Sequence, residues 1–88
     1  MIKIYGKPNC AYCIAAKQLL DNNEIPYVYE ELGVTFAKEE LSAIAPAARS
    51  FPVIVVDGRY IGGYTALNAQ LASIKESVGL SGPEFLAD

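Results

Sequence analysis

Histidine is absent from this sequence. Its absence excludes Ser-His-Asp and Cys-His catalysis and removes the commonest metal-binding side chain. Charged residues make up only 19% of the chain and the net charge is −3, so no basic surface for nucleic acid is predicted. No apolar run approaches the roughly 18 residues of a membrane-spanning helix. The first residues, MIKIY, do not resemble a signal peptide. We therefore expect a cytoplasmic protein without membrane or nucleic-acid partners.

Cysteine is scarce as well, with two residues in the chain, Cys10 and Cys13. In a chain that is not secreted, such a pair is more often catalytic or metal-binding than a structural staple. A structural zinc site needs four ligands, and two thiols without imidazole cannot supply them in a monomer. Two small buried core residues remain the alternative to a redox pair.

The chain is long enough for one domain, and 52% of its 88 residues are hydrophobic. The apolar spacing and the turn residues predict a strand at 1–5, a helix at 10–23, a strand at 27–31, a helix at 35–45, a hairpin at 53–63 and a helix at 64–78. This β-α-β-α-β-β-α order predicts an α/β fold in which three helices flank a four-stranded mixed sheet. We expect the domain to span 1–79, with a tail at 80–88 whose Phe85 and Leu86 could dock onto it.

Several local features support these elements. Asp57 and Gly58 suit the positive φ angles of a tight hairpin turn, and the run 53–56 predicts a central strand covered on both faces. Thr35 is the expected N-cap of the second helix, whose apolar stripe is Phe36, Leu41, Ile44 and Ala45. Thr65 is the expected cap of the last helix.

The position of the cysteine pair predicts its chemistry. Cys10 opens the first predicted helix, and Cys13 lies one turn later on the same face. The first N–H groups of a helix lack intrahelical partners, so those of Tyr12 and Cys13 are expected to point at the Cys10 sulfur. Cysteines in such pairs have pKa values of roughly 3.5–7, against about 8.5 for a free cysteine. We expect an exposed nucleophilic Cys10 thiolate and a less accessible Cys13 that resolves the mixed disulfide.

The chain resembles the glutaredoxin family, whose members have the thioredoxin-like fold. KPNCAYC at 7–13 is similar to the family's active-site run K-P-x-C-P-Y-C. ARSFPVIVVDGRYIGGYTAL at 48–67 is similar to a family segment that joins R-T-V-P to I-G-G-Y, and the element order agrees. The resemblance spans about residues 1 to 75. It implies a dithiol glutaredoxin that reduces protein disulfides and glutathione mixed disulfides, with glutathione as co-substrate and Cys10 and Cys13 as catalytic residues.

The resemblance also implies a glutathione groove beside the redox pair. The residues at the family's binding positions are Lys7, Tyr12, Arg49, Phe51, Pro52, Gly63, Tyr64 and Thr65. Lys7 and Arg49 are expected at the glycine carboxylate of glutathione, and residues 63–65 at its γ-glutamyl end. Phe51 is expected to pair its backbone with the cysteinyl part, beside a cis-proline at Pro52.

Three residues depart from the family pattern, and one of them, Phe51 in place of a valine, is expected to narrow the groove. Ala11 stands in place of the usual proline between the cysteines, and Ala66 in place of an acidic residue that usually meets the γ-glutamyl ammonium. Ala11 is compatible with an alternative in which two subunits bind an iron–sulfur cluster and Cys10 is a cluster ligand. In the main interpretation the reaction requires no metal. Ala66 leaves room for a thioredoxin-like hydrogen donor that serves ribonucleotide reductase and is recharged by a flavoprotein reductase. The main expectation is a monomer whose partners are glutathione and disulfide-containing proteins.

Overall fold

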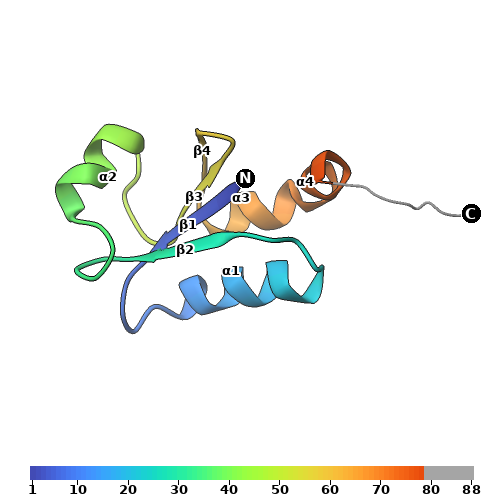
Figure 1. The fold of residues 1–88 in the computed structure, drawn as a ribbon, viewed down its shortest axis with the longest axis horizontal. Coiled ribbons are helices and arrows are strands. Elements are labelled where there is room, and N and C mark those ends of the chain that lie inside the picture. Colours follow the sequence, from blue (N-terminus) through green and yellow to red (C-terminus); the bar gives the residue numbers. More distant parts are fainter. Residues whose placement is uncertain (79–88) are drawn as a thin grey trace, which may run out of the picture.

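The computed structural model describes residues 1–78 of the chain, so the tail predicted at 80–88 lies outside the described residues. The elements are β1 (Ile2–Gly6), α1 (Ala11–Asn22), β2 (Val28–Glu31), α2 (Lys38–Ile44), β3 (Val53–Val56), β4 (Arg59–Gly62), α3 (Tyr64–Ala69) and α4 (Leu71–Val78). The strands form one sheet in the order β2-β1-β3-β4 (Figure 1). β1 is parallel to β2 and antiparallel to β3, which is antiparallel to β4, so the predicted mixed sheet is confirmed.

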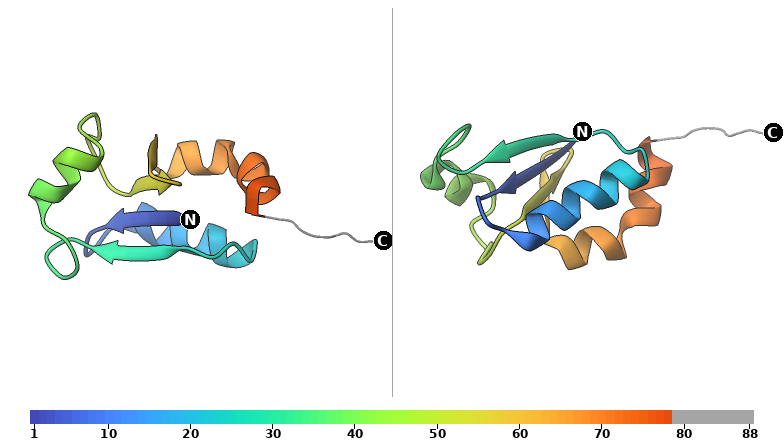
Figure 2. Two further views of the ribbon diagram at one scale, coloured as in Figure 1. Left: turned by 45° about the horizontal axis from the view of Figure 1, so that its top comes forward. Right: turned by 90° about the horizontal axis from the view of Figure 1, so that it is seen from below.

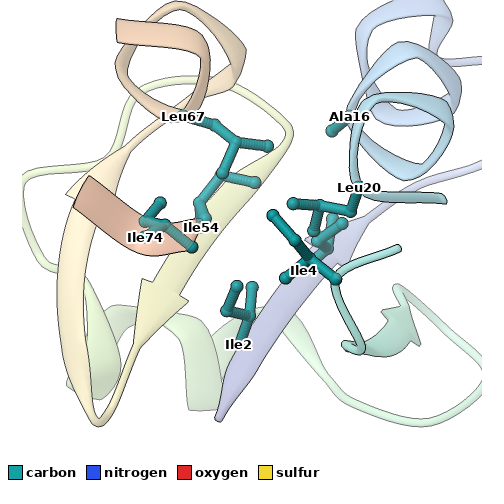
Figure 3. Close-up of a cluster of buried hydrophobic side chains, with 8 residues drawn as sticks. Ile2, Ile4, Ala16, Leu20, Ile54, Leu67 and Ile74 are labelled. Atoms are coloured by element: carbon teal, nitrogen blue, oxygen red, sulfur yellow. The ribbon is translucent and has the colours of Figure 1, made fainter. Parts of the chain in front are cut away.

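The two central strands send alternate side chains into two hydrophobic clusters. Ile4 of β1 pairs with Ile54 of β3, and both belong to the cluster under α1, α3 and α4 (Figure 3). Tyr5 pairs with Val53, and both belong to the cluster that α2 covers. Figure 2 shows α1 beside α3, with α2 lying apart from them. This arrangement follows from strand alternation, because successive residues of a strand face opposite sides of the sheet.

The hairpin between β3 and β4 forms at the dipeptide that the sequence indicated. Asp57 has a φ of 51° and Gly58 a φ of 83°, the positive values that a two-residue hairpin turn needs. The Asp57 N–H also donates to the Met1 carbonyl at 2.9 Å, and the N-terminal ammonium pairs with the Asp57 carboxylate. The turn is therefore tied to the start of β1.

The second helix begins later than predicted, and its expected cap is wrong. Ala37 occupies the N-cap position of α2 and makes no side-chain hydrogen bond there. The Thr35 hydroxyl instead accepts a hydrogen bond from the Glu31 N–H at 2.8 Å, within the turn that closes the Leu32–Phe36 bridge. Ile44 was expected in the buried stripe but is 38% exposed.

The helix predicted at 64–78 is two helices. Gln70 has φ −101° and ψ 10°, which interrupts the helical backbone between α3 and α4. The bend allows Leu67 of α3 and Ile74 of α4 to enter the same core cluster. The N-cap of α3 is Gly63, which makes no side-chain cap bond, so the cap expected at Thr65 is wrong as well.

Candidate active site

The first helix begins at the redox pair. The chain leaves β1, turns at Asn9 with a φ of 59°, and reaches Cys10, which is the N-cap residue of α1. The Cys13 N–H donates a hydrogen bond to the Cys10 sulfur at 3.1 Å. One of the two donors expected from the sequence is therefore in place, and it is the one at the third helical position that an N-cap side chain commonly engages. An N–H aimed at this sulfur stabilises the thiolate that Cys10 becomes when the disulfide is reduced.

Cys10 and Cys13 form a disulfide, with their Cα atoms 5.2 Å apart. The expectation of an exposed Cys10 is wrong, because only 8% of this residue is accessible. Cys13 is 1% accessible, so the predicted order of accessibility between the two residues is confirmed. The pair lies at the N-terminus of α1, where an incoming thiolate meets Cys10 before Cys13. This geometry suits reversible thiol–disulfide exchange.

A shallow groove of about 350 Å³ lies beside the pair, within the size range of small-molecule sites. Its lining residues are Tyr12, Ser50, Phe51, Pro52, Gly63, Tyr64 and Thr65. Three separate segments meet there: the start of α1, the loop before β3, and the start of α3. All but one of these residues were predicted. Ser50 was missed, although it stands at the threonine position of the family's R-T-V-P run.

The walls of this groove are held by close contacts. The rings of Tyr12 and Tyr64 lie 5.7 Å apart between centroids and are tilted by 31°. The Phe51–Pro52 peptide bond is cis, as the resemblance implied. A Cβ added to Gly63 would lie 3.3 Å from the Pro52 carbonyl oxygen, so the absence of a side chain at Gly63 lets these two segments approach.

The two predicted cations lie outside this groove. The Lys7 ammonium is 5.7 Å from the centre of the Phe51 ring, so it reaches the groove's wall without lining the groove itself. Arg49 lines a second, smaller groove together with Lys38 and Phe51. Arg49 does not line the groove beside the redox pair, but it adjoins that groove through Ser50 and Phe51, which line both grooves.

Ala66 of α3 lies close to Gly62 at the end of β4. A Cβ added to Gly62, whose φ is 131°, would lie 2.7 Å from the Ala66 Cβ. Helix α3 therefore sits close to the end of β4 at this point, and no carboxylate extends from residue 66.

Within residues 1–78, no three or more His, Cys, Asp or Glu side chains are grouped as metal ligands would be. Nor does that part of the chain contain a helix long and apolar enough to cross a membrane.

The family model that describes glutaredoxins matches residues 2–61. The chain belongs to the glutaredoxin family. Glutaredoxin 1 of Rickettsia felis is 39% identical over 70 residues, which cover 75% of this chain and 67% of that protein. The glutaredoxin of Haemophilus influenzae is 32% identical over 88 residues, which cover 90% of this chain and 95% of that protein.

Solved structures support the same fold. The crystal structure of a buckwheat glutaredoxin–glutathione complex superposes with a TM-score of 0.69, covering 82% of this chain and 68% of that chain. At 23% identity this likeness shows the fold, which is the predicted thioredoxin-like one. The glutaredoxin family and the Cys10–Cys13 disulfide together support thiol–disulfide oxidoreductase activity.

Proposed function

We propose that this glutaredoxin is a dithiol enzyme that uses glutathione to reduce protein disulfides and glutathione mixed disulfides. The observation that carries the proposal is the groove formed by Tyr12, Pro52 and Tyr64 beside a disulfide whose Cys10 sulfur accepts the Cys13 N–H. In this proposal the protein acts as a monomer in the cytoplasm, where glutathione keeps thiols reduced.

Cys10 is the nucleophile that attacks a protein disulfide. Its thiolate attacks one substrate sulfur, the substrate S–S bond breaks, and the other substrate sulfur leaves as a thiolate. Cys13 then loses its proton to solvent and attacks the Cys10 sulfur. The Cys10–Cys13 bond forms and the second substrate thiolate leaves, so the substrate gains two electrons and the enzyme loses two. Cys13 can take part in this intramolecular step although it is buried, because the Cα atoms of Cys10 and Cys13 are only 5.2 Å apart.

Glutathione restores the dithiol in two exchanges. One glutathione thiolate attacks Cys10, releases the Cys13 thiolate and leaves glutathione on Cys10. A second glutathione thiolate attacks the sulfur of the bound glutathione, forming oxidised glutathione and releasing the Cys10 thiolate. When Cys10 has taken glutathione from a protein mixed disulfide, the same attack by a second glutathione thiolate removes that glutathione and frees the Cys10 thiolate. Only Cys10 is needed for that reaction.

The groove supplies groups of the kinds that a tripeptide needs. Tyr12 and Tyr64 offer aromatic walls, and the backbone of Phe51 before the cis-proline is available to pair with an extended peptide. Thr65 and the first N–H groups of α3 are proposed to receive the γ-glutamyl end, and Lys7 and Arg49 the glycine carboxylate. The buckwheat glutaredoxin was crystallised as a complex with glutathione, which adds support for the ligand class.

The decisive experiment compares Cys10→Ser and Cys13→Ser in two assays, both coupled to glutathione and glutathione reductase. We expect Cys10→Ser to abolish turnover of a glutathionylated peptide and of a protein disulfide. Cys13→Ser should retain the first activity and lose the second, because only the second needs two enzyme thiols. Equal loss in both variants and both assays would contradict the assigned roles.

A parallel assay supplies thioredoxin reductase and NADPH in place of glutathione. We expect no turnover with this donor. Turnover with the flavoprotein and none with glutathione would overturn the glutathione proposal and favour a thioredoxin-like hydrogen donor, the alternative that Ala66 leaves open.

A further inference from the structure

A second groove, between α2 and the loop before β3, shares Ser50 and Phe51 with the groove beside the redox pair. Its lining residues are Lys38, Leu41, Ser42, Ala45, Pro46, Ala48, Arg49, Ser50, Phe51 and Val53, and we call it the α2 groove. Its floor is apolar, because Leu41, Ala45 and Val53 are all buried members of the cluster under α2. Its volume of about 160 Å³ is well below the several hundred Å³ of small-ligand sites, so it suits one or two side chains of a longer chain.

The charged residues that line the α2 groove are all positive. Lys38 and Arg49 are its only charged lining residues, and both are exposed. Glu39 and Glu40 lie on the same helix but do not line the groove. Within residues 1–78 the ion pairs are Met1–Asp57 and Lys3–Glu30, so neither Lys38 nor Arg49 has a carboxylate partner there. Two unpaired cations on an acidic protein make this groove complementary to carboxylates.

The α2 groove is joined to the groove beside the redox pair. Ser50 and Phe51 line both grooves, and the Lys7 ammonium lies 5.7 Å from the centre of the same Phe51 ring. A polypeptide whose disulfide reacts at Cys10 therefore has a continuous route across Phe51 onto α2. Glutathione, which is a tripeptide, is proposed to fill the first groove and to meet the α2 groove only at Arg49, so Lys38 is left to a longer chain.

We propose that the α2 groove binds an acidic segment of a protein substrate, with one apolar side chain on its floor and carboxylates at Lys38 and Arg49. This inference rests on the disulfide-reducing part of the proposed function and does not depend on glutathione. Exposed charge pairs are individually weak, so the expected gain is modest and depends on salt. Charge complementarity of this kind acts mostly on the rate of productive encounter.

The test uses peptides closed by an intramolecular disulfide. One peptide carries Glu-Leu-Glu next to a cysteine, and its counterpart carries Lys-Leu-Lys at the same place. Both are made with the tripeptide before and after the cysteine, so that either chain direction is sampled. Reduced protein is mixed with each peptide without glutathione, and the rate of Cys10–Cys13 disulfide formation is followed by acid quenching, thiol alkylation and mass spectrometry.

For the wild-type protein we expect at least one acidic peptide to react about two- to tenfold faster than its basic counterpart at low ionic strength. Lys38→Glu should remove or reverse this preference, and 0.5 M salt, at roughly a 4 Å screening length, should shrink it. The matched control is Lys75→Glu, the same charge change on α4, which lies at the opposite end of the molecule from α2 (Figure 1). It should leave the preference intact.

Hydroxyethyl disulfide is a small neutral substrate, too short to contact the α2 groove while it reacts at Cys10. It should therefore react at the same rate with the wild type, Lys38→Glu and Lys75→Glu. Equal wild-type rates with acidic and basic peptides would overturn the proposal, as would a preference that survives Lys38→Glu or is lost equally in Lys75→Glu. Because no glutathione is present, a failure of the glutathione proposal leaves this result unaffected.

Discussion

Gly6, at the end of β1, lies where the Tyr29 side chain covers the backbone. A Cβ at this position would overlap the Tyr29 hydroxyl and lie 2.8 Å from the Cζ atom of that ring. The Lys17 ammonium of α1 also lies 4.0 Å from the centre of this ring. Burial and then the charge of Glu31 raise the pKa of Tyr29, so the phenol stays neutral at physiological pH. The absence of a side chain at Gly6 therefore leaves the space that the Tyr29 side chain occupies.

Gly6→Ala should lower the free energy of unfolding by about 1–3 kcal/mol, the usual cost of overpacking, because Tyr29 must move away from residue 6. Urea unfolding measures this cost. In a Tyr29→Ala background the same substitution should cost much less, since the overlapping ring is gone. Additive effects of the two substitutions would contradict the steric explanation.

The catalytic residues could be predicted from the sequence because their chemistry is local. Cys10 and Cys13 need only a turn and the first turn of a helix, and both features are visible in residues 7–17. The positions of Lys7 and Arg49 could not be predicted in this way. The Lys7 ammonium lies near the Phe51 ring and Arg49 lines the α2 groove, and both positions depend on how the loop before β3 packs beside α2.

At the scale of elements, the β3–β4 hairpin combines a turn preference with an ion pair. Asp57 has a positive φ, and its carboxylate pairs with the N-terminal ammonium, with both groups about two-thirds exposed. Exposed pairs contribute little, whereas a non-glycine residue with positive φ is costly unless it is Asn or Asp. The turn preference should therefore matter more than the charge.

Asp57→Asn should change the free energy of unfolding by less than about 1 kcal/mol, because asparagine keeps the turn preference and loses only the ion pair. Asp57→Ala should cost roughly 1–2 kcal/mol more, because alanine is disfavoured at positive φ. Thermal and urea unfolding at low salt compare the two. Similar losses for both variants would instead assign the stabilisation to the carboxylate.

The elements that sequence patterns predicted best are those with an unambiguous local signal. The hairpin is an example, because Asp57-Gly58 between two apolar runs has few other interpretations. The break at Gln70 had no such signal, since Leu67, Leu71 and Ile74 have spacings that fit a straight helix equally well. Thr35 was a reasonable cap by residue type, but its hydroxyl is used by Glu31 in the preceding turn. At Gln70 tertiary packing decided the outcome, and at Thr35 a hydrogen bond within the preceding turn did.

At the scale of the whole molecule, the two hydrophobic clusters lie on opposite faces of one sheet and meet at β1 and β3. Their buried members come from positions between Ile2 and Ile74. The buried helix residues Leu20 and Leu67 face the same strands, so the helix that carries the redox pair and the helix that closes its groove share one core (Figure 3). Stability of the fold and geometry of the site are therefore linked through these residues.

We propose that residues 1–79 are the complete folding unit, as expected from the sequence. A chain ending at Gly79 should then unfold within about 2–4 °C of the full chain, which corresponds to about 0.5 kcal/mol for a domain of this size. Ile74→Ala in the full chain provides the contrast, because removing this buried side chain should cost about 2–5 kcal/mol. Differential scanning calorimetry compares the three proteins. If the shortened chain loses as much stability as Ile74→Ala, residues 80–88 contribute to the folded domain and the boundary at 79 is wrong.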